Sequence, residues 1–161
     1  MGAVLCVEYS GGEKAAYALA LYDPSASSRL AGQLPWLRHP SGIRGRFSKR
    51  RYLEGFPRRF CERLHPLLLY YSVVGSLPRL LGEIGWAVQR FPVGRVYLDY
   101  HLYNKASIRG MLRGHEVVPE NKAALTLGKE GRAALAVFYA LDALMLIYKR
   151  WGWKRVPRCR P

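Results

Sequence analysis

Two apolar runs separated by a turn begin the chain. Residues 3–8 are apolar up to Glu8, a pattern typical of a buried strand that ends in an acid. Gly11-Gly12 then marks a turn, and residues 15–22 form a second apolar run of strand length. The alanine and leucine content of this second run would also suit a helix. A short run beyond a Gly-Gly turn favours an antiparallel hairpin, and we expect a loop over residues 23–28.

The middle of the chain lacks a clear period. Residues 29–63 are interrupted by proline and glycine, and the basic segment 43–53 within them predicts either a third strand or a basic loop. A helical stretch opens at Pro66, which suits a first helical turn, and extends to about Arg90. We expect this helix to be broken or kinked near residues 75–78, where Gly and Pro occur.

Strands and helices alternate in the second half. Residues 95–99 predict a strand ending in Asp99, residues 104–114 a short basic helix, and residues 115–118 a short strand. The last predicted helix covers about residues 129–151.

The last predicted helix contains an almost unbroken apolar stretch at residues 133–148. A membrane-spanning helix needs about 20 such residues, and this stretch also contains Asp142. We therefore expect a buried central helix and no membrane association. A membrane-associated basic protein is the third hypothesis for this chain, and it requires the helix to be exposed to lipid.

The length permits one hydrophobic core and not two. We predict a single α/β domain over residues 1–151, with residues 29–63 as a basic irregular insertion. Residues 152–161 form a basic C-terminal tail, which we expect to be partly disordered because its charges have no acidic partners in sequence.

Net charge identifies the class of partner. The chain has 26 Lys and Arg against 11 Asp and Glu, a formal charge of +15 with a pI near 10.2, which favours polyanions. We predict nucleic-acid binding, with RNA slightly favoured over DNA. Four aromatic residues interleave with the first basic cluster and could stack on unpaired bases: Phe47, Tyr52, Phe56 and Phe60. The predicted phosphate-binding residues are Arg44, Arg46, Lys49, Arg50, Arg51, Arg58, Arg59, Lys154 and Arg155.

Cysteine usage and the N-terminus bear on the compartment. Three widely spaced cysteines form no zinc-binding pattern, and Cys6 fits a core position. The N-terminal residues lead into a strand without the basic segment of a secretory signal, so we expect a cytoplasmic protein. The chain has only two Asn and two Gln, and this scarcity of thermolabile amides indicates a thermophile.

Four acids stand at the ends of apolar strands or inside the apolar helix, where an unpaired carboxylate is costly to bury. They are Glu8, Asp99, Glu120 and Asp142. A metal site facing a phosphate backbone would explain both these acids and the basic charge. Structural roles are the alternative: Glu8 could pair with Lys14 or an arginine, Asp99 could cap the turn before His101, and Asp142 could form an ion pair in the core.

In element order and acid placement the chain resembles the ribonuclease H-like superfamily. Residues 7–11 are similar to the Asp-Glu-Ser-Gly start of one branch, although Glu8 stands where Asp is usual. Residues 140–144 are similar to the Asp-Ala-Leu pattern of the Holliday-junction resolvase branch. Glu120 lies in no recognisable motif. The resemblance implies a mixed sheet flanked by helices and a set of metal ligands at these acids.

The resemblance also implies a reaction. Two Mg²⁺ or Mn²⁺ ions about 3.5–4 Å apart would stabilise the attacking and leaving oxygens of a phosphodiester displacement. Glu8, Asp99 and Asp142 are the predicted metal ligands, and Glu120 joins them as a candidate catalytic residue. The leading hypothesis is therefore a nucleic-acid-binding protein of ribonuclease H-like fold, which these acids could make a nuclease. The alternative is a non-catalytic protein that binds structured RNA in a ribosome or another ribonucleoprotein.

Overall fold

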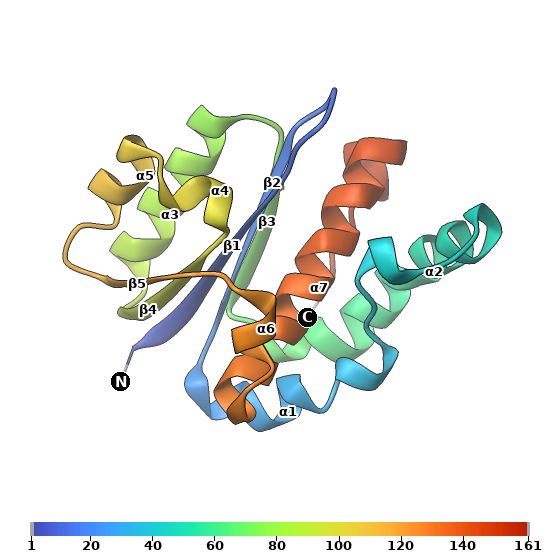
Figure 1. The fold of residues 1–161 in the computed structure, drawn as a ribbon, viewed down its shortest axis with the longest axis horizontal. Coiled ribbons are helices and arrows are strands. Elements are labelled where there is room, and N and C mark those ends of the chain that lie inside the picture. The colour runs from blue at the N-terminus through green and yellow to red at the C-terminus, as the bar shows by residue number, and fades with distance from the viewer. Residues whose placement is uncertain (1, 161) are drawn as a thin grey trace.

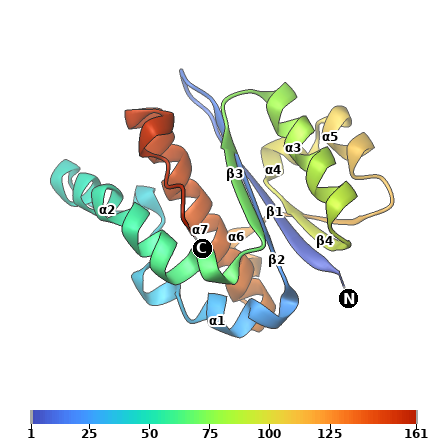
Figure 2. The ribbon, with the colours of Figure 1, turned by 180° about the vertical axis from the view of Figure 1, so that it is seen from behind.

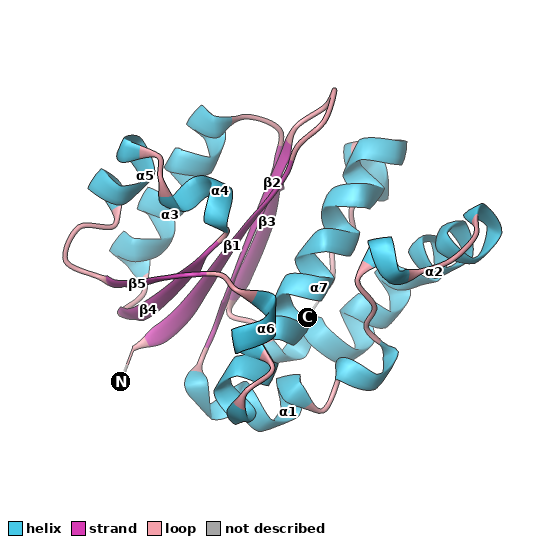
Figure 3. Ribbon diagram, in the orientation of Figure 1, coloured by secondary structure: helices cyan, strands magenta, loops and turns pink. Residues whose placement is uncertain are grey.

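A five-stranded mixed sheet forms the centre of the molecule in the computed structural model, which describes residues 2–160 (Figures 1 and 3). The strand order is β3-β2-β1-β4-β5. Strands β1 and β2 pair in antiparallel fashion, as do β2 and β3, whereas β1, β4 and β5 run parallel. The strands are β1 (Ala3–Ser10), β2 (Ala16–Tyr22), β3 (Tyr70–Val74), β4 (Val93–Leu98) and β5 (Glu116–Pro119).

Helices cover both faces of the sheet (Figures 1 and 2). Helices α3 and α5 lie on one face, and α7 with α1 and α2 lies on the other. The helices are α1 (Ser27–Ala31), α2 (Arg46–Arg59), α3 (Leu77–Arg90), α4 (Tyr100–Tyr103), α5 (Ala106–Met111), α6 (Lys122–Leu125) and α7 (Gly128–Trp151). Short 3-10 turns occupy Pro24–Ala26, Leu34–Trp36, Pro40–Gly42, His65–Leu67 and Trp153–Arg155, and a π-helical turn, Phe60–Leu64, extends α2.

The predicted fold class is confirmed: the chain is a single α/β domain with a mixed sheet flanked by helices. The predicted hairpin is β1–β2, with Glu8 opposite Ala18. Alternation along β1 sends Cys6 to the α7 face and Leu5 and Val7 to the α3 face, because successive strand residues point to opposite sides. The strand order is compatible with a ribonuclease H-like arrangement.

Helix α7 lies at the centre of the helical layer that also contains α1 and α2. Ala16, Ala18 and Ala20 of β2 are fully buried beneath it, and their small side chains let the helix approach the sheet closely. The helix is long and apolar enough to cross a membrane, but 72% of its most apolar window is buried inside the fold. Most of this helix is therefore covered by the fold, whereas the membrane hypothesis requires it to be exposed to lipid.

The prediction for residues 43–53 was wrong in both its forms, because Arg46–Arg59 is a helix. Leu53 and Phe56 on one side of α2 are buried, so the segment has an apolar face that its many arginines hide. Most of the predicted irregular insertion is therefore helical. The expected loop at residues 23–28 likewise contains the start of α1.

The third strand lies instead at Tyr70–Val74, inside the stretch predicted as the first part of a long helix. Its β-branched and aromatic residues pair with β2. Helix α3 starts only at Leu77, where Ser76 caps it and accepts a hydrogen bond from the Arg79 amide at 3.4 Å. The expected break near residues 75–78 is thus a boundary between strand and helix.

Residues 152–160 of the C-terminal tail are held against the fold, where the sequence predicted partial disorder. Cys159 forms a disulfide with Cys61, which follows α2. The Tyr71 hydroxyl donates to the Pro157 carbonyl at 2.6 Å and accepts from the Cys159 amide at 3.2 Å. The cysteine spacing gave no sign of this pairing, since 98 residues separate the two positions. The third cysteine, Cys6, is buried as predicted.

Reduction of the disulfide should destabilise the protein. Cross-linking positions 98 residues apart restricts the unfolded chain, and removing such a bond costs typically about 2–4 kcal/mol of unfolding free energy. Urea denaturation with and without reductant measures the loss. The double variant Cys61→Ser/Cys159→Ser is the control and should not respond to reductant. Equal midpoints for oxidised and fully reduced wild-type protein would contradict the expectation.

Candidate metal centre

Three acids lie side by side because of the register of the parallel strands. Val7, Leu98 and Pro119 are partners across β1, β4 and β5, and each is followed by an acid. The ladder continues past the strand ends, where the Asp99 amide donates to the Val7 carbonyl at 2.9 Å. The Glu120 amide donates to the Leu98 carbonyl at 2.6 Å. Glu8, Asp99 and Glu120 therefore form one row, which we call the acidic triad.

The acidic triad has the burial and donor set of a metal site. Ligand oxygens of its three residues all lie within 4.8 Å of one another. Glu8 is only 2% exposed and the Glu120 side chain 4%. Among the described residues, Glu8 Oε2 and Glu120 Oε1 are buried without a hydrogen-bond partner. Buried carboxylate oxygens are costly unless a cation or donor meets them, and Mg²⁺ and Mn²⁺ prefer such oxygens, so the residues fit a divalent ion.

Local capping fixes the backbone beside the triad. The Asp99 carboxylate accepts a hydrogen bond from the His101 amide at 2.8 Å and so caps α4. The His101 ring Nδ1 lies 3.1 Å from the same Asp99 oxygen, Oδ1. Asn121 caps α6 by accepting from the Ala123 amide at 3.1 Å, immediately after Glu120. The capping role foreseen for Asp99 is therefore real and coexists with its place in the triad.

Asp142, on α7, lies near the acidic triad but forms an ion pair with Lys122. Its Oδ2 accepts from Lys122 Nζ at 3.2 Å and lies 3.6 Å from His39 Nε2. Lys122 Nζ also lies 3.9 Å from Glu120 Oε1. The expected ion pair of Asp142 is thus present, whereas Lys14, the suggested partner of Glu8, lies 4.3 Å from the centre of the Tyr148 ring. Lys122 and His39 were missed, because only the fold brings their loops to Asp142.

The carboxyl groups perturb one another strongly. Burial, followed by the adjoining carboxyl of Asp99, raises the pKa of Glu8 far above its ordinary value of 4.5. Burial also raises the pKa of Glu120 to about 7, although Lys122 acts in the opposite direction. It raises the pKa of Asp142 too, against the same ammonium. Burial opposes charge on Lys122, but the carboxylates outweigh it and raise the lysine pKa. Without a further cation, Glu8 keeps its proton at neutral pH.

A cleft of about 590 Å³ opens over these groups and is lined by Glu8, Asp99, Lys122 and Asp142. Its remaining wall comes from the β1–β2 turn, the loop around His39, helix α7, and Lys49 from the first turn of α2. Lys49 is therefore the one residue of the predicted phosphate-binding set that borders the cleft. Glu8, Asp99 and Asp142 thus face the cleft, whereas Glu120 lies behind its lining, next to Lys122.

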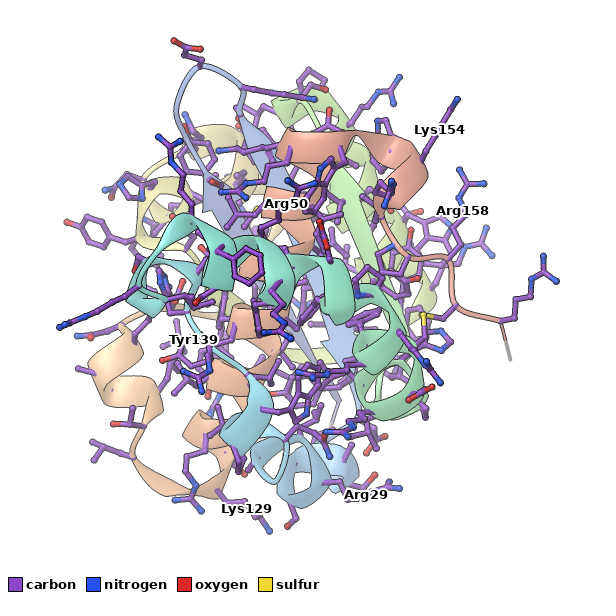
Figure 4. The ribbon with its side chains drawn as sticks, turned by 90° about the vertical axis from the view of Figure 1, so that its right-hand side faces the viewer. Arg29, Arg50, Lys129, Tyr139, Lys154 and Arg158 are labelled. Carbon is purple, nitrogen blue, oxygen red and sulfur yellow. A yellow bond between two sulfur atoms is a disulfide. The ribbon has the colours of Figure 1, made fainter. Side chains whose placement is uncertain are left out.

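All eight other predicted basic residues are exposed on α2, the loop before it or the tail. The exposed members are Arg44, Arg46, Arg50, Arg51, Arg58, Arg59, Lys154 and Arg155. Arg50 pairs with Glu54 at 2.7 Å and Arg58 with Glu62 at 3.1 Å, so these two are partly neutralised. Figure 4 looks at this side, and Arg29, Arg50, Lys154 and Arg158 all lie on it. We call it the α2 face.

The aromatic part of the basic pattern was largely misread. Phe56 and Phe60 are buried in the core, and Tyr52 is half-buried, with its hydroxyl accepting from the Arg38 amide at 3.1 Å. Phe47, which is 76% exposed, is the one of the four that remains free to stack. Tyr52, Phe56 and Phe60 are four residues apart and so share one side of a helix, but this segment was expected to be a strand or a loop, and the pattern was therefore missed.

No protein-family model matches this chain, and a search of the curated proteins finds no match.

The raised pKa of Glu8 predicts a pH-dependent stability. Between 4.5 and the raised pKa, the folded protein holds a proton that the unfolded chain has released. The free energy of unfolding should therefore fall as pH rises, by up to about 1.4 kcal/mol per pH unit. Glu8→Gln should remove this contribution. Urea denaturation from about pH 5 to 8 in EDTA measures it, with Glu13→Gln in the exposed hairpin turn as control. Parallel curves for wild type and Glu8→Gln would refute this assignment.

Proposed function

We propose that the protein is a divalent-metal-dependent nuclease that binds nucleic acid and cleaves phosphodiesters at the acidic triad. The observation that carries the proposal is the row of three buried carboxylates whose ligand oxygens lie within 4.8 Å, two of them without a hydrogen-bond partner. Glu8, Asp99 and Glu120 would hold Mg²⁺ or Mn²⁺. Such an ion, when bound, supplies Lewis-acid stabilisation of charge on the phosphoryl oxygens.

The chain's own residues contribute positioning and charge. Asp99 is held by the α4 cap, and the backbone of Glu120 is held by its hydrogen bond to β4, so both residues start from fixed backbone positions. The Asp99 contact orients the His101 imidazole, which lines the cleft and is 72% exposed. A phosphodiester seated in the cleft would contact this ring and the Lys49 ammonium.

Nucleic acid is the proposed partner because cations surround an acidic cleft. A net charge of +15 draws a phosphate backbone toward the protein. The α2 face offers guanidinium groups that can hold phosphate in bidentate fashion. Lys49 links that face to the cleft, so a strand bound along α2 would lead to the triad. RNA stays the slightly favoured partner over DNA, although Phe47 is the one member of the four aromatic residues that is exposed for stacking on a base.

A non-catalytic RNA-binding role is the second candidate. The Lys122–Asp142 pair and the Asp99 cap satisfy two of the four acids structurally, as that role requires. It leaves Glu8 Oε2 without a partner and Glu120 Oε1 with only the distant Lys122 ammonium at 3.9 Å, whereas a purely structural cluster gains nothing from buried oxygens that accept no hydrogen bond. We therefore favour the nuclease.

Cytoplasmic location and a thermophilic source are proposed together. Disulfides are rare in the cytoplasm of mesophiles but common in intracellular proteins of hyperthermophiles. The Cys61–Cys159 bond and the scarcity of Asn and Gln are both explained by a hyperthermophile's cytoplasm. The long apolar helix is buried in the fold, which agrees with a protein free of the membrane.

Metal binding can be tested without assuming a substrate. Mn²⁺ at a hundredfold excess over its dissociation constant adds about 2.7 kcal/mol of stability, a rise in Tm of roughly 5–10 °C. Asp99→Asn should abolish both this shift and Mn²⁺-dependent cleavage, because the amide can still cap α4 but is a poor metal ligand. Differential scanning calorimetry measures the shift.

Glu13→Gln, which changes an exposed acid in the hairpin turn, is the matched control and should keep the full shift and activity. A wild-type Tm indifferent to Mn²⁺, together with a destabilised Asp99→Asn variant, would leave the non-catalytic RNA-binding role.

Binding along the α2 face predicts a salt dependence. Each bound phosphate contributes about 0.7–0.9 to the slope of log affinity against log salt. Reversing the charges of Arg50 and Arg51, both exposed, should weaken binding and lower the slope by about this amount for each phosphate that the variant no longer binds. Fluorescence anisotropy with labelled RNA and DNA measures it. Arg79→Glu/Arg90→Glu on α3 makes the same charge change on the opposite face. An equal effect of both double variants would exclude a specific α2 footprint.

A further inference from the structure

The cleft contains a second cluster beside the acidic triad. Asp142, Lys122 and His39 come from α7, α6 and the loop before α2, and they meet at Asp142 Oδ2. The Lys122 ammonium lies 3.2 Å from this oxygen and 3.9 Å from Glu120 Oε1. It therefore joins the fourth acid to the triad.

Lys122 is held in this place by the local fold. Asn121 caps the four-residue helix α6, and Lys122 is its first residue, two positions after Glu120. The Glu120 backbone is fixed in turn by its hydrogen bond to Leu98. The lysine side chain is 36% exposed and lines the cleft, so its ammonium faces both the carboxylates and the space for a ligand.

Three of the four acids surround one possible cation position, and the fourth, Asp142, already pairs with Lys122. Glu8 and Glu120 each have a buried oxygen without a hydrogen-bond partner, and ligand oxygens of Glu8, Asp99 and Glu120 lie within 4.8 Å of one another, which suits one divalent ion. Octahedral Mg²⁺ with bonds of about 2.0–2.1 Å places opposite ligands roughly 4.2 Å and adjacent ligands roughly 2.9 Å apart, so the three oxygens, now within 4.8 Å of one another, would close around the ion as it binds. A second ion shared by Glu120 and Asp142 would have to displace the Lys122 ammonium from between them.

We propose that the site holds a single divalent ion, at Glu8, Asp99 and Glu120, and that the Lys122 ammonium takes the place of a second one. This inference rests on the proposed metal site and revises the expectation of two ions. Lys122 positions Glu120 and Asp142 by pairing with both, and its remaining N–H groups can donate to a phosphate oxygen in the cleft. The Lys122 ammonium thus supplies the second positive charge at the scissile phosphate.

The stoichiometry of Mn²⁺ binding tests this assignment. Isothermal titration calorimetry should find one ion for each wild-type chain and two for Lys122→Met, which vacates the position and leaves Asp142 free to bind. Electron paramagnetic resonance should show dipolar broadening only in that variant, because two ions about 3.5–4 Å apart couple strongly. Lys122→Met/Asp142→Asn should return to one ion.

Lys49→Met is the matched control, since Lys49 lines the same cleft but forms no ion pair with the four carboxylates among the described residues. The Lys49→Met variant should bind one Mn²⁺ ion, as the wild type does. If Lys122→Met is unfolded without metal, the dependence of its Mn²⁺-induced folding on metal concentration, followed by circular dichroism, gives the stoichiometry.

The outcomes separate the two proposals. No Mn²⁺ binding by the wild type would remove the metal site itself. Two coupled ions in the wild type, or one ion in both the wild type and Lys122→Met, would leave the metal site standing and overturn the role of Lys122.

Discussion

The parallel register of β1, β4 and β5 is the constraint on which the site depends. Neighbouring strands lie about 4.7–4.9 Å apart, and the acidic triad occupies one row across three of them. Glu8 and Glu120 start two strand spacings apart, roughly 9.5 Å, so their side chains converge on Asp99 for the ligand oxygens to lie within 4.8 Å of one another. A shift of one residue in any of these strands would turn its acid toward the other face and dissolve the row.

The fold keeps this row at the boundary between core and solvent. Helix α7 seals one side of the sheet and brings Asp142 to the cleft, while the caps of α4 and α6 end the strands beside it. Burial prevents these carboxyl groups from all being ionised at once, while the cleft leaves Glu8, Asp99 and Asp142 within reach of a ligand. Glu8 relieves the repulsion by holding a proton, and Lys122 relieves it by pairing with Asp142.

Exposed Lys and Arg side chains surround this acidic cleft at longer range. The α2 face consists of cations on a helix whose other side is anchored in the core by Leu53, Phe56 and Phe60. The disulfide at Cys61 and the bonds to Tyr71 fix the basic tail beside that helix. The Lys and Arg side chains of α2 and the tail are therefore attached to a fixed backbone. This arrangement depends on contacts between residues far apart in sequence.

The sequence by itself determined the buried first strand, the hairpin, the central helix and the four acids with the metal chemistry they suggest. These are local features, since an apolar run that ends in an acid has few structural uses. It misjudged α2, β3 and the tail, because the burial of Phe56 and the pairing of Tyr70–Val74 depend on partners distant in the chain. Only the tertiary structure decided that Glu120 joins the triad and that Lys122 pairs with Asp142. Strand register and helix packing set those distances, and neither is written in the spacing of the residues.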